Sequence, residues 1–100
     1  MTTNQSNIAL NHTIQSWGFA SINDFAREQA KSILQQKIAY YQSQINFFEQ
    51  KYGVDFNVFC EKFDSISKHS IIEKEDDSIR WEAAIDATNE YQNEYFSIQS

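Results

Sequence analysis

The sequence predicts an all-α fold in which one long central helix packs with shorter helices as a helical hairpin or bundle. Proline is absent and only two glycines occur among 100 residues, so residues that favour turns are scarce. Apolar side chains recur at intervals of three and four residues along most of the chain, which is the period of an amphipathic helix. Because 41% of the residues are hydrophobic, the chain can bury the core of one small domain, to which we assign residues 1–100.

The N-terminal part is expected to contain a tail and a short helix. Residues 1–7, "MTTNQSN", are polar and uncharged, and we expect them to be disordered. Residues 8–17 place apolar side chains at loose helical spacing, and Gly18 suits the left-handed position that follows a helix. We place the helical core at residues 8–64.

The main helix is expected to run from Ser21 to Gly53. Ser21 suits the N-cap, and Asp24 three residues later resembles a capping box, which satisfies the first amide groups of a helix. About 31 residues at about 1.5 Å each give a length of about 46 Å. That is long for a compact domain of this size, whose radius of gyration would be about 13 Å.

This length predicts a homodimer. The last helix of the chain, at about 22 residues, would cover only about 33 Å of the apolar seam on the main helix. The uncovered part of the seam should then bind a second chain. We expect the dimer contacts to be Ile38, Tyr41, Ile45 and Phe48.

Two further helices are expected after the main one. Asp55 suits the N-cap of a short helix whose apolar face comprises Phe56, Phe59, Cys60 and Phe63. We interpret residues 65–75 as a linker, and the acids at its end favour a helix start there. The last helix is expected over residues 76–98. Its apolar seam comprises Trp81, Ala84, Thr88, Tyr91, Tyr95 and Ile98.

Charge is unevenly distributed along the chain. Residues 1–60 carry four basic and four acidic side chains, so the whole net charge of −6 lies in residues 61–100. No Lys or Arg follows Arg80, whereas four acids recur every four residues: Glu82, Asp86, Glu90 and Glu94. Like charges at this spacing destabilise a helix by about 0.2–0.5 kcal/mol per pair. A basic protein partner would relieve the repulsion; the alternative is a solvated face.

No catalytic or metal-binding motif is evident. Cys60 is the only cysteine and is expected to be a small buried hydrophobe. His12 and His69 lie far apart, without further ligands at metal-binding spacing. We therefore expect no enzyme activity, no metal and no cofactor. Because no stretch is long and apolar enough to span a membrane and no signal-peptide pattern is present, we expect a cytoplasmic protein that does not bind membranes.

Two stretches resemble segments of known antitoxins. The first, "WGFASINDFAREQAKSIL", resembles the part of ribbon-helix-helix-like antitoxins in which a Gly-Phe turn leads into a Ser-capped helix. The second, "FFEQKYGVDFNVFCEKF" followed by "EKEDDSIRWEAAI", is similar to the continuation in small antitoxins of bacterial and archaeal toxin–antitoxin loci. The resemblance covers roughly residues 17–90. Its matching residues are Gly18, Phe19, Ser21, Phe25 and Arg27, then Lys51, Tyr52, Gly53, Phe56, Phe59, Asp76, Asp77, Trp81 and Glu82.

This resemblance implies a protein that binds and neutralises a cognate toxin with a basic surface. An acidic, aromatic last helix would supply both buried anchors and carboxylates that pair with Arg or Lys. We expect the anchors to be Trp81, Ile85, Tyr91 and Tyr95, and the electrostatic contacts to be Glu82, Asp86, Glu90 and Glu94. The aromatic residues on the seams of the main helix and the last helix also fit a core within one chain. A competing interpretation of the chain is a homo-oligomeric helical adaptor with no toxin partner.

We predict that the isolated chain does not bind duplex DNA appreciably at physiological salt. Ribbon-helix-helix proteins read DNA with a basic N-terminal strand, whereas residues 1–23 contain no Lys, Arg, Asp or Glu. Contacts to DNA phosphates need the positive charges of Lys or Arg. An electrophoretic mobility-shift assay with the promoter fragment of its own gene checks this, and tight, sequence-selective retention of that fragment would contradict the prediction.

Overall fold

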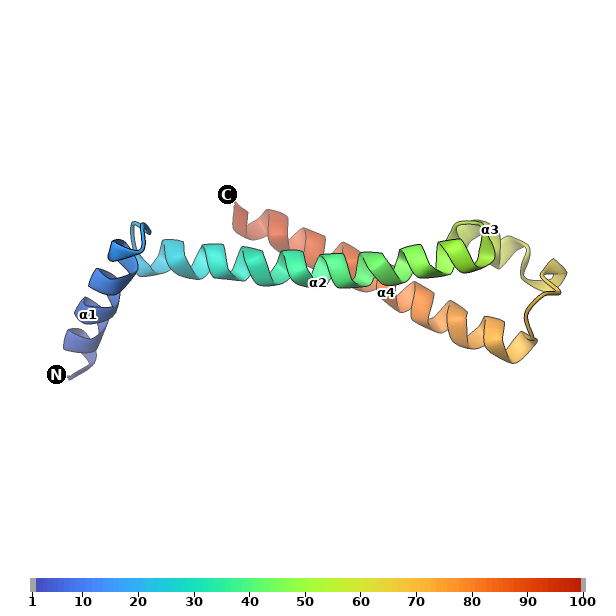
Figure 1. The fold of residues 1–100 in the computed structure, drawn as a ribbon, viewed down its shortest axis with the longest axis horizontal. Coiled ribbons are helices and arrows are strands. Elements are labelled where there is room, and N and C mark those ends of the chain that lie inside the picture. The colour runs from blue at the N-terminus through green and yellow to red at the C-terminus, as the bar shows by residue number, and fades with distance from the viewer. Residues whose placement is uncertain (1, 100) are drawn as a thin grey trace.

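The computed structural model describes residues 2–99, with side chains from residue 5 onward, and shows a helical hairpin with shorter helices at its two ends (Figure 1). No strand occurs within residues 2–99, so the predicted all-α fold with one long helix packed against another is confirmed. The elements are α1 (Thr2–Ser16), α2 (Ile22–Tyr52), α3 (Phe56–Glu61), the 3-10 helix η1 (Phe63–Ser65) and α4 (Ile71–Gln99).

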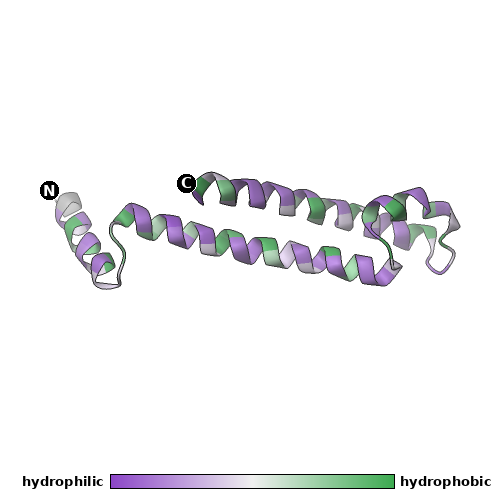
Figure 2. Ribbon diagram, turned by 90° about the horizontal axis from the view of Figure 1, so that it is seen from above, coloured by the Kyte–Doolittle hydropathy of each residue, from purple (hydrophilic) through white to green (hydrophobic). Residues whose placement is uncertain are grey.

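The hairpin is a rod rather than a globule. Its principal extents are 67 × 24 × 18 Å and its radius of gyration is 21.1 Å, well above the value of about 13 Å for a compact chain of this length. The two long helices, α2 and α4, run side by side and antiparallel (Figures 1 and 2). Hydrophobic and hydrophilic residues are interleaved along both of them (Figure 2).

Local capping sets the ends of α2 as predicted. The Ser21 side-chain oxygen accepts a hydrogen bond from the Asp24 backbone N–H at 3.2 Å. At the other end, Gly53 adopts a left-handed φ of 71°, and its N–H donates to the Glu49 carbonyl at 2.7 Å. A side chain at Gly53 would be strained in this conformation, which explains the glycine. No proline interrupts the 31 residues between these caps.

The N-terminal expectation was wrong. Residues 2–7 belong to α1 rather than to a disordered tail, and Met1 lies outside the described residues. No proline or glycine separates residues 2–7 from the part of α1 that packs on the rest of the chain, so nothing stops the helix from extending backward. The docking residues are the buried Ile14 and the rings of Trp17 and Phe19, which lie 6.1 and 5.2 Å from the Phe25 ring.

The last helix begins earlier than predicted. α4 starts at Ile71, so the linker expected over residues 65–75 shrinks to the few residues between η1 and α4. Ser70 forms the N-cap, because its Oγ accepts the Glu73 N–H at 3.1 Å. The Ser70-x-x-Glu73 spacing has the residue types of a capping box, a signal that the expected boundary of residue 76 overlooked.

An aromatic cluster holds the turn end of the hairpin together. Trp81 of α4 is fully buried and stacks on Phe48 of α2, with ring centroids 5.6 Å apart. The rings of Tyr52, Phe59 and Phe56 lie 5.9, 5.1 and 5.3 Å from Trp81. The short helix α3 therefore covers the end of the α2–α4 seam. Ile45 and Ala84 complete this core.

The residues predicted to form a homodimer lie on the buried side of α2, where α4 packs. Ile45 and Phe48 are buried in the core, and Ile38 and Tyr41 are half-buried. The Tyr41 ring stacks on Tyr91 at 6.0 Å. The four residues pack within the chain to this extent because α4 has 29 residues, more than the length assumed. A dimer through them stays a prediction.

A polar network adjoins the aromatic cluster. Lys51 Nζ lies 2.6 Å from both Asp77 Oδ2 and Glu73 Oε2, and the Tyr52 hydroxyl donates to Asp77 Oδ2 at 2.6 Å. Burial alone would raise the pKa of Asp77, but the hydrogen bonds from Lys51 and Tyr52 outweigh it and lower that pKa. The hydrogen bond to Asp77 raises the pKa of Lys51, and burial raises that of Tyr52. The network therefore favours charged Lys51 and Asp77 and neutral Tyr52.

A buried lysine binds the segment between α3 and α4 to the start of α4. Lys74 lies in the first turns of α4, and its Nζ donates to the carbonyl oxygens of Phe63 and Ile66 at 2.5 and 2.8 Å. The ammonium group also lies 4.5 Å from the centre of the Phe63 ring. These contacts satisfy a buried charge and fix the connection against α4.

We predict that Asp77→Asn lowers the free energy of unfolding by about 1.5–3 kcal/mol at neutral pH, because hydrogen bonds to a charged group contribute about this much. The pKa of Asp77 is lower in the folded chain than its ordinary value of 3.8. The contribution of the charged carboxylate is therefore present above that value and is lost as pH falls through the folded pKa.

Thermal or urea unfolding followed by circular dichroism at pH 7, 5 and 3 measures this. The difference between wild type and Asp77→Asn should shrink toward pH 3. Asp76→Asn is the matched control, because Asp76 is exposed and should change stability by less than about 0.5 kcal/mol. A difference that does not vary with pH would show that the Asp77 charge is not what stabilises the turn end.

Candidate protein-binding surface

The acidic row lies on α4, and all four of its side chains are exposed. Within residues 2–99, none of Glu82, Asp86, Glu90 and Glu94 forms an ion pair. A step of four residues turns a helix by about 400°, so each carboxylate is rotated by about 40° from the one before. The row therefore winds around α4 by about 120° from first to last and does not stay on one face.

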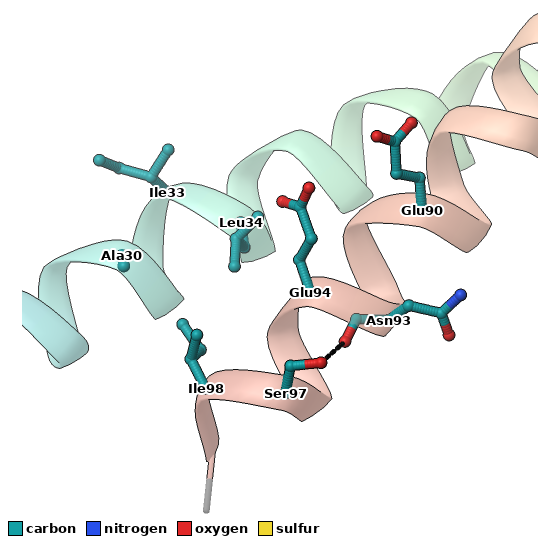
Figure 3. Close-up of a pocket in the computed structure, with 8 residues that line it drawn as sticks. All are labelled: Ala30, Ile33, Leu34, Glu90, Asn93, Glu94, Ser97 and Ile98. Atoms are coloured by element: carbon teal, nitrogen blue, oxygen red, sulfur yellow. Dashed lines mark hydrogen bonds between the residues drawn. The ribbon is translucent and has the colours of Figure 1, made fainter.

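The end of the row reaches a groove between α2 and α4. This groove has a volume of about 630 Å³ and is lined by Glu90 and Glu94 together with the apolar Ala30, Ile33, Leu34 and Ile98. Figure 3 shows Ile98 of α4 pointing toward α2, with Glu94 on the next turn. Glu94 thus belongs to the side of the hairpin, whereas the beginning of the row lies elsewhere on α4.

Two of the predicted anchors belong to the core. Trp81 is 0% exposed and is enclosed by rings of α2 and α3, so it is wrong as a surface anchor. Ile85 is half-buried and packs against the same core cluster. The seam that suggested these anchors is the apolar stripe of α4 on which α2 of the same chain packs.

The other two predicted anchors also face α2. Tyr91 stacks on Tyr41, and the ammonium of Lys37 lies 5.1 Å from the centre of its ring. The Tyr95 hydroxyl accepts a hydrogen bond from Gln35 Nε2 at 3.2 Å. Both tyrosines are half-buried. Their main contacts are therefore within the chain.

Exposed apolar residues that the sequence analysis did not select lie on the opposite side of α4. Ile72 and Ile79 are 73% and 68% exposed. At about 100° per residue, Ile79 lies about 160° around the helix from the buried Trp81. The sequence did contain a sign of this face, since Ile72 and Ile79 are seven residues apart and Asp86 follows at the same interval. It was overlooked because the first apolar seam was assigned to the partner.

These isoleucines share a face with the first part of the acidic row. We define the outer face of α4 as the exposed residues spaced by three and four along it: Ile72, Glu75, Ile79, Glu82, Asp86 and Glu90. In chain order this face carries Ile, Glu, Ile, Glu, Asp and Glu over about five turns of helix, so both apolar side chains lie in its first half. None of these carboxylates is paired within residues 2–99.

Groups that could support other chemistry lie apart from this face. Cys60, expected to be buried, is exposed. His69 lies at the turn end, where its Nδ1 is 3.2 Å from Glu73 Oε2. Within residues 2–99, no three His, Cys, Asp or Glu side chains are grouped closely enough to hold a metal ion. None of the helices in this part of the chain has the length and apolar character needed to cross a membrane.

Comparison with protein-family models, curated proteins and solved structures finds no match for this chain. The similarity to antitoxins therefore stays a prediction from the motifs named above. The evidence for a binding role is the arrangement of the outer face itself.

Proposed function

We propose that the chain is a protein-binding module whose outer face on α4 docks on a basic surface of a partner protein. The observation that carries this proposal is that unpaired carboxylates and the exposed Ile72 and Ile79 share one face of α4. A face that served only to keep the helix solvated would have no need of two isoleucines at seven-residue spacing.

The two kinds of side chain have different roles in this proposal. Burying an exposed isoleucine contributes about 1.5–3 kcal/mol, so Ile72 and Ile79 provide most of the affinity. The carboxylates attract the basic surface over a distance and speed association. Pairing them with Lys or Arg also removes the repulsion between neighbours at i,i+4, which is about 0.2–0.5 kcal/mol per pair.

The motifs named in the sequence give this partner a more specific identity. We propose that it is a toxin whose basic active surface the outer face covers, so that binding neutralises it. In this proposal the anchors are Ile72 and Ile79, in place of the buried Trp81 and its neighbours. The role is one of binding and not of catalysis.

The competing proposal is a homo-oligomeric adaptor. It is favoured by a second set of exposed apolar residues, on α2, comprising Ile33, Tyr40 and Phe47. These residues lie on a different side of the hairpin from Ile72 and Ile79, so self-association through them leaves both isoleucines free. Only Glu90 of the outer face borders the groove that Ile33 also lines.

We predict that removing charge from the outer face slows partner binding. The test variant is Glu82→Gln, Asp86→Asn, Glu90→Gln, and the matched control is Glu49→Gln, Glu61→Gln, Asp64→Asn. Both triple variants remove three exposed negative charges of the same types. The partner is the protein encoded beside the gene, coexpressed and purified with the chain.

The test variant should associate about tenfold more slowly at low salt, and its rate should depend less on salt concentration. The control should keep the wild-type rate and salt dependence. In cells, the test variant should restore growth less well than the control when the neighbouring protein arrests growth. Equal association rates for the two triple variants would show that the acidic row is a solvated face.

We predict a different kinetic effect for Ile79→Ser. This variant should raise the dissociation rate from the same partner about tenfold or more, because it removes buried apolar contact and no charge. Its salt dependence should match wild type. Ile71→Ser is the control, since Ile71 is similarly exposed but lies about 100° around the helix from Ile72. If both serine variants dissociate like wild type, the outer face has no apolar anchor at Ile79.

A further inference from the structure

One side of the hairpin carries an exposed apolar row on α2. Ile33, Tyr40 and Phe47 are spaced by seven residues and are 51%, 57% and 59% exposed. A seven-residue apolar repeat is the pattern by which helices pack against other helices in coiled coils. The row lies about 120–160° around α2 from the buried Ile45, so α4 does not cover it.

A row with the same period and a charged residue at each end runs along α4. It consists of Arg80, Ala87 and Glu94, again spaced by seven residues. Arg80 lines a hollow together with Phe47, and Glu94 lines the groove together with Ile33 (Figure 3). Both rows therefore lie on one side of the hairpin. We define this lateral face as Ile33, Tyr40, Phe47, Arg80, Ala87 and Glu94.

The two rows share a common midpoint. Across the hairpin, Phe48 contacts Trp81 and Tyr41 contacts Tyr91, so Ala87 lies level with residues 43–44 of α2. That level is midway between Tyr40 and Phe47. It is also midway between Arg80 and Glu94, which each lie about 10 Å from Ala87 along the helix.

Opposite charges at equal distances from one midpoint make a surface complementary to itself. A two-fold axis through the level of Ala87, lying in the plane of contact and perpendicular to the helices, reverses the helix direction in a second copy. Arg80 then faces Glu94 of the second copy, and Tyr40 faces its Phe47. Both contacts occur twice, as a two-fold interface requires. The small Ala87 at the axis lets the two α4 helices approach closely.

We propose that the lateral face is a self-association surface, on which a second copy of this chain packs antiparallel to form a four-helix bundle. In this arrangement α4 packs on α4 and α2 on α2, and the exposed aromatic rings of both copies become buried. The proposal does not depend on the partner-binding role of the outer face, whose Ile79 lies about 100° around α4 from Arg80. The two faces meet only at Glu90, which borders the groove beside Ile33 and Glu94.

Charge exchange tests the register of this dimer. Sedimentation velocity of the full chain is measured from about 1 to about 100 μM. Over this range wild type should shift from the mass of one chain to the mass of two. Arg80→Glu and Glu94→Arg should each weaken the dimer at least tenfold, because each places like charges opposite one another twice. The double variant carrying both changes should recover to within about threefold of wild type, because the opposite charges again face each other.

Truncation of the aromatic row provides a second measurement. Tyr40→Ala should weaken the dimer at least tenfold, whereas Phe96→Ala, a similarly exposed ring on α4 outside the lateral face, should leave it unchanged. Circular dichroism verifies that all variants remain helical. A wild-type chain that stays monomeric at 100 μM overturns the proposal. So does a double charge variant that remains as weak as the single ones, because the copies then pair in another register.

Discussion

The burial of Trp81 between α2 and α3 is the interaction on which the fold depends. Its ring meets Phe48 and Tyr52 of α2 and Phe56 and Phe59 of α3. An aromatic side chain buries about 150–250 Å², which stabilises the fold by about 4–6 kcal/mol. The indole Nε1 has no hydrogen-bond partner within the described residues, which costs about 1–3 kcal/mol. The net effect still favours burial and explains why the chain reverses direction here.

Stability is therefore concentrated at the turn end of the rod. The aromatic cluster, the Lys51–Asp77 pair and the buried Lys74 all lie within this end. Farther along α4, the buried Thr88 has an unpaired hydroxyl, and the residues beyond it are half-buried or exposed. Fewer buried contacts mean that local opening requires less free energy. The groove beside Glu94 thus lies at the end of the hairpin that opens more readily.

Signals that act over three or four residues predicted the fold well. Ser21, Gly53 and Asp55 form the caps expected of them, because a cap depends on its own backbone neighbours. The start of α4 also depends on a local cap, but this cap was overlooked. The Ser70-x-x-Glu73 spacing was present but lay within a stretch interpreted as a linker.

The candidate site could not be predicted in the same way. Periodicity identified the apolar stripes of α2 and α4, but a stripe does not reveal whether its own chain or another chain covers it. Because α4 is longer than expected, it occupies this stripe of α2: Ile45, Phe48 and Trp81 are buried, and the other expected dimer contacts and anchors are half-buried. The outer face and the lateral face emerged only after the core was known, because both are defined by exposure. Rotation of the acidic row by about 40° per step also separated Glu94 from Glu82, which the sequence spacing had placed together.

The two tryptophans of the chain occupy opposite environments. Trp81 is enclosed by aromatic rings at the turn end, whereas Trp17 is 62% exposed beside α1 at the other end of the rod. The intrinsic ultraviolet emission of the protein therefore combines a signal from a dry interior with one from a hydrated surface. Dissolved quenchers reach the second indole far more easily than the first. The molecule thus carries two native optical reporters, one for the integrity of its core and one for the docking of its N-terminal helix.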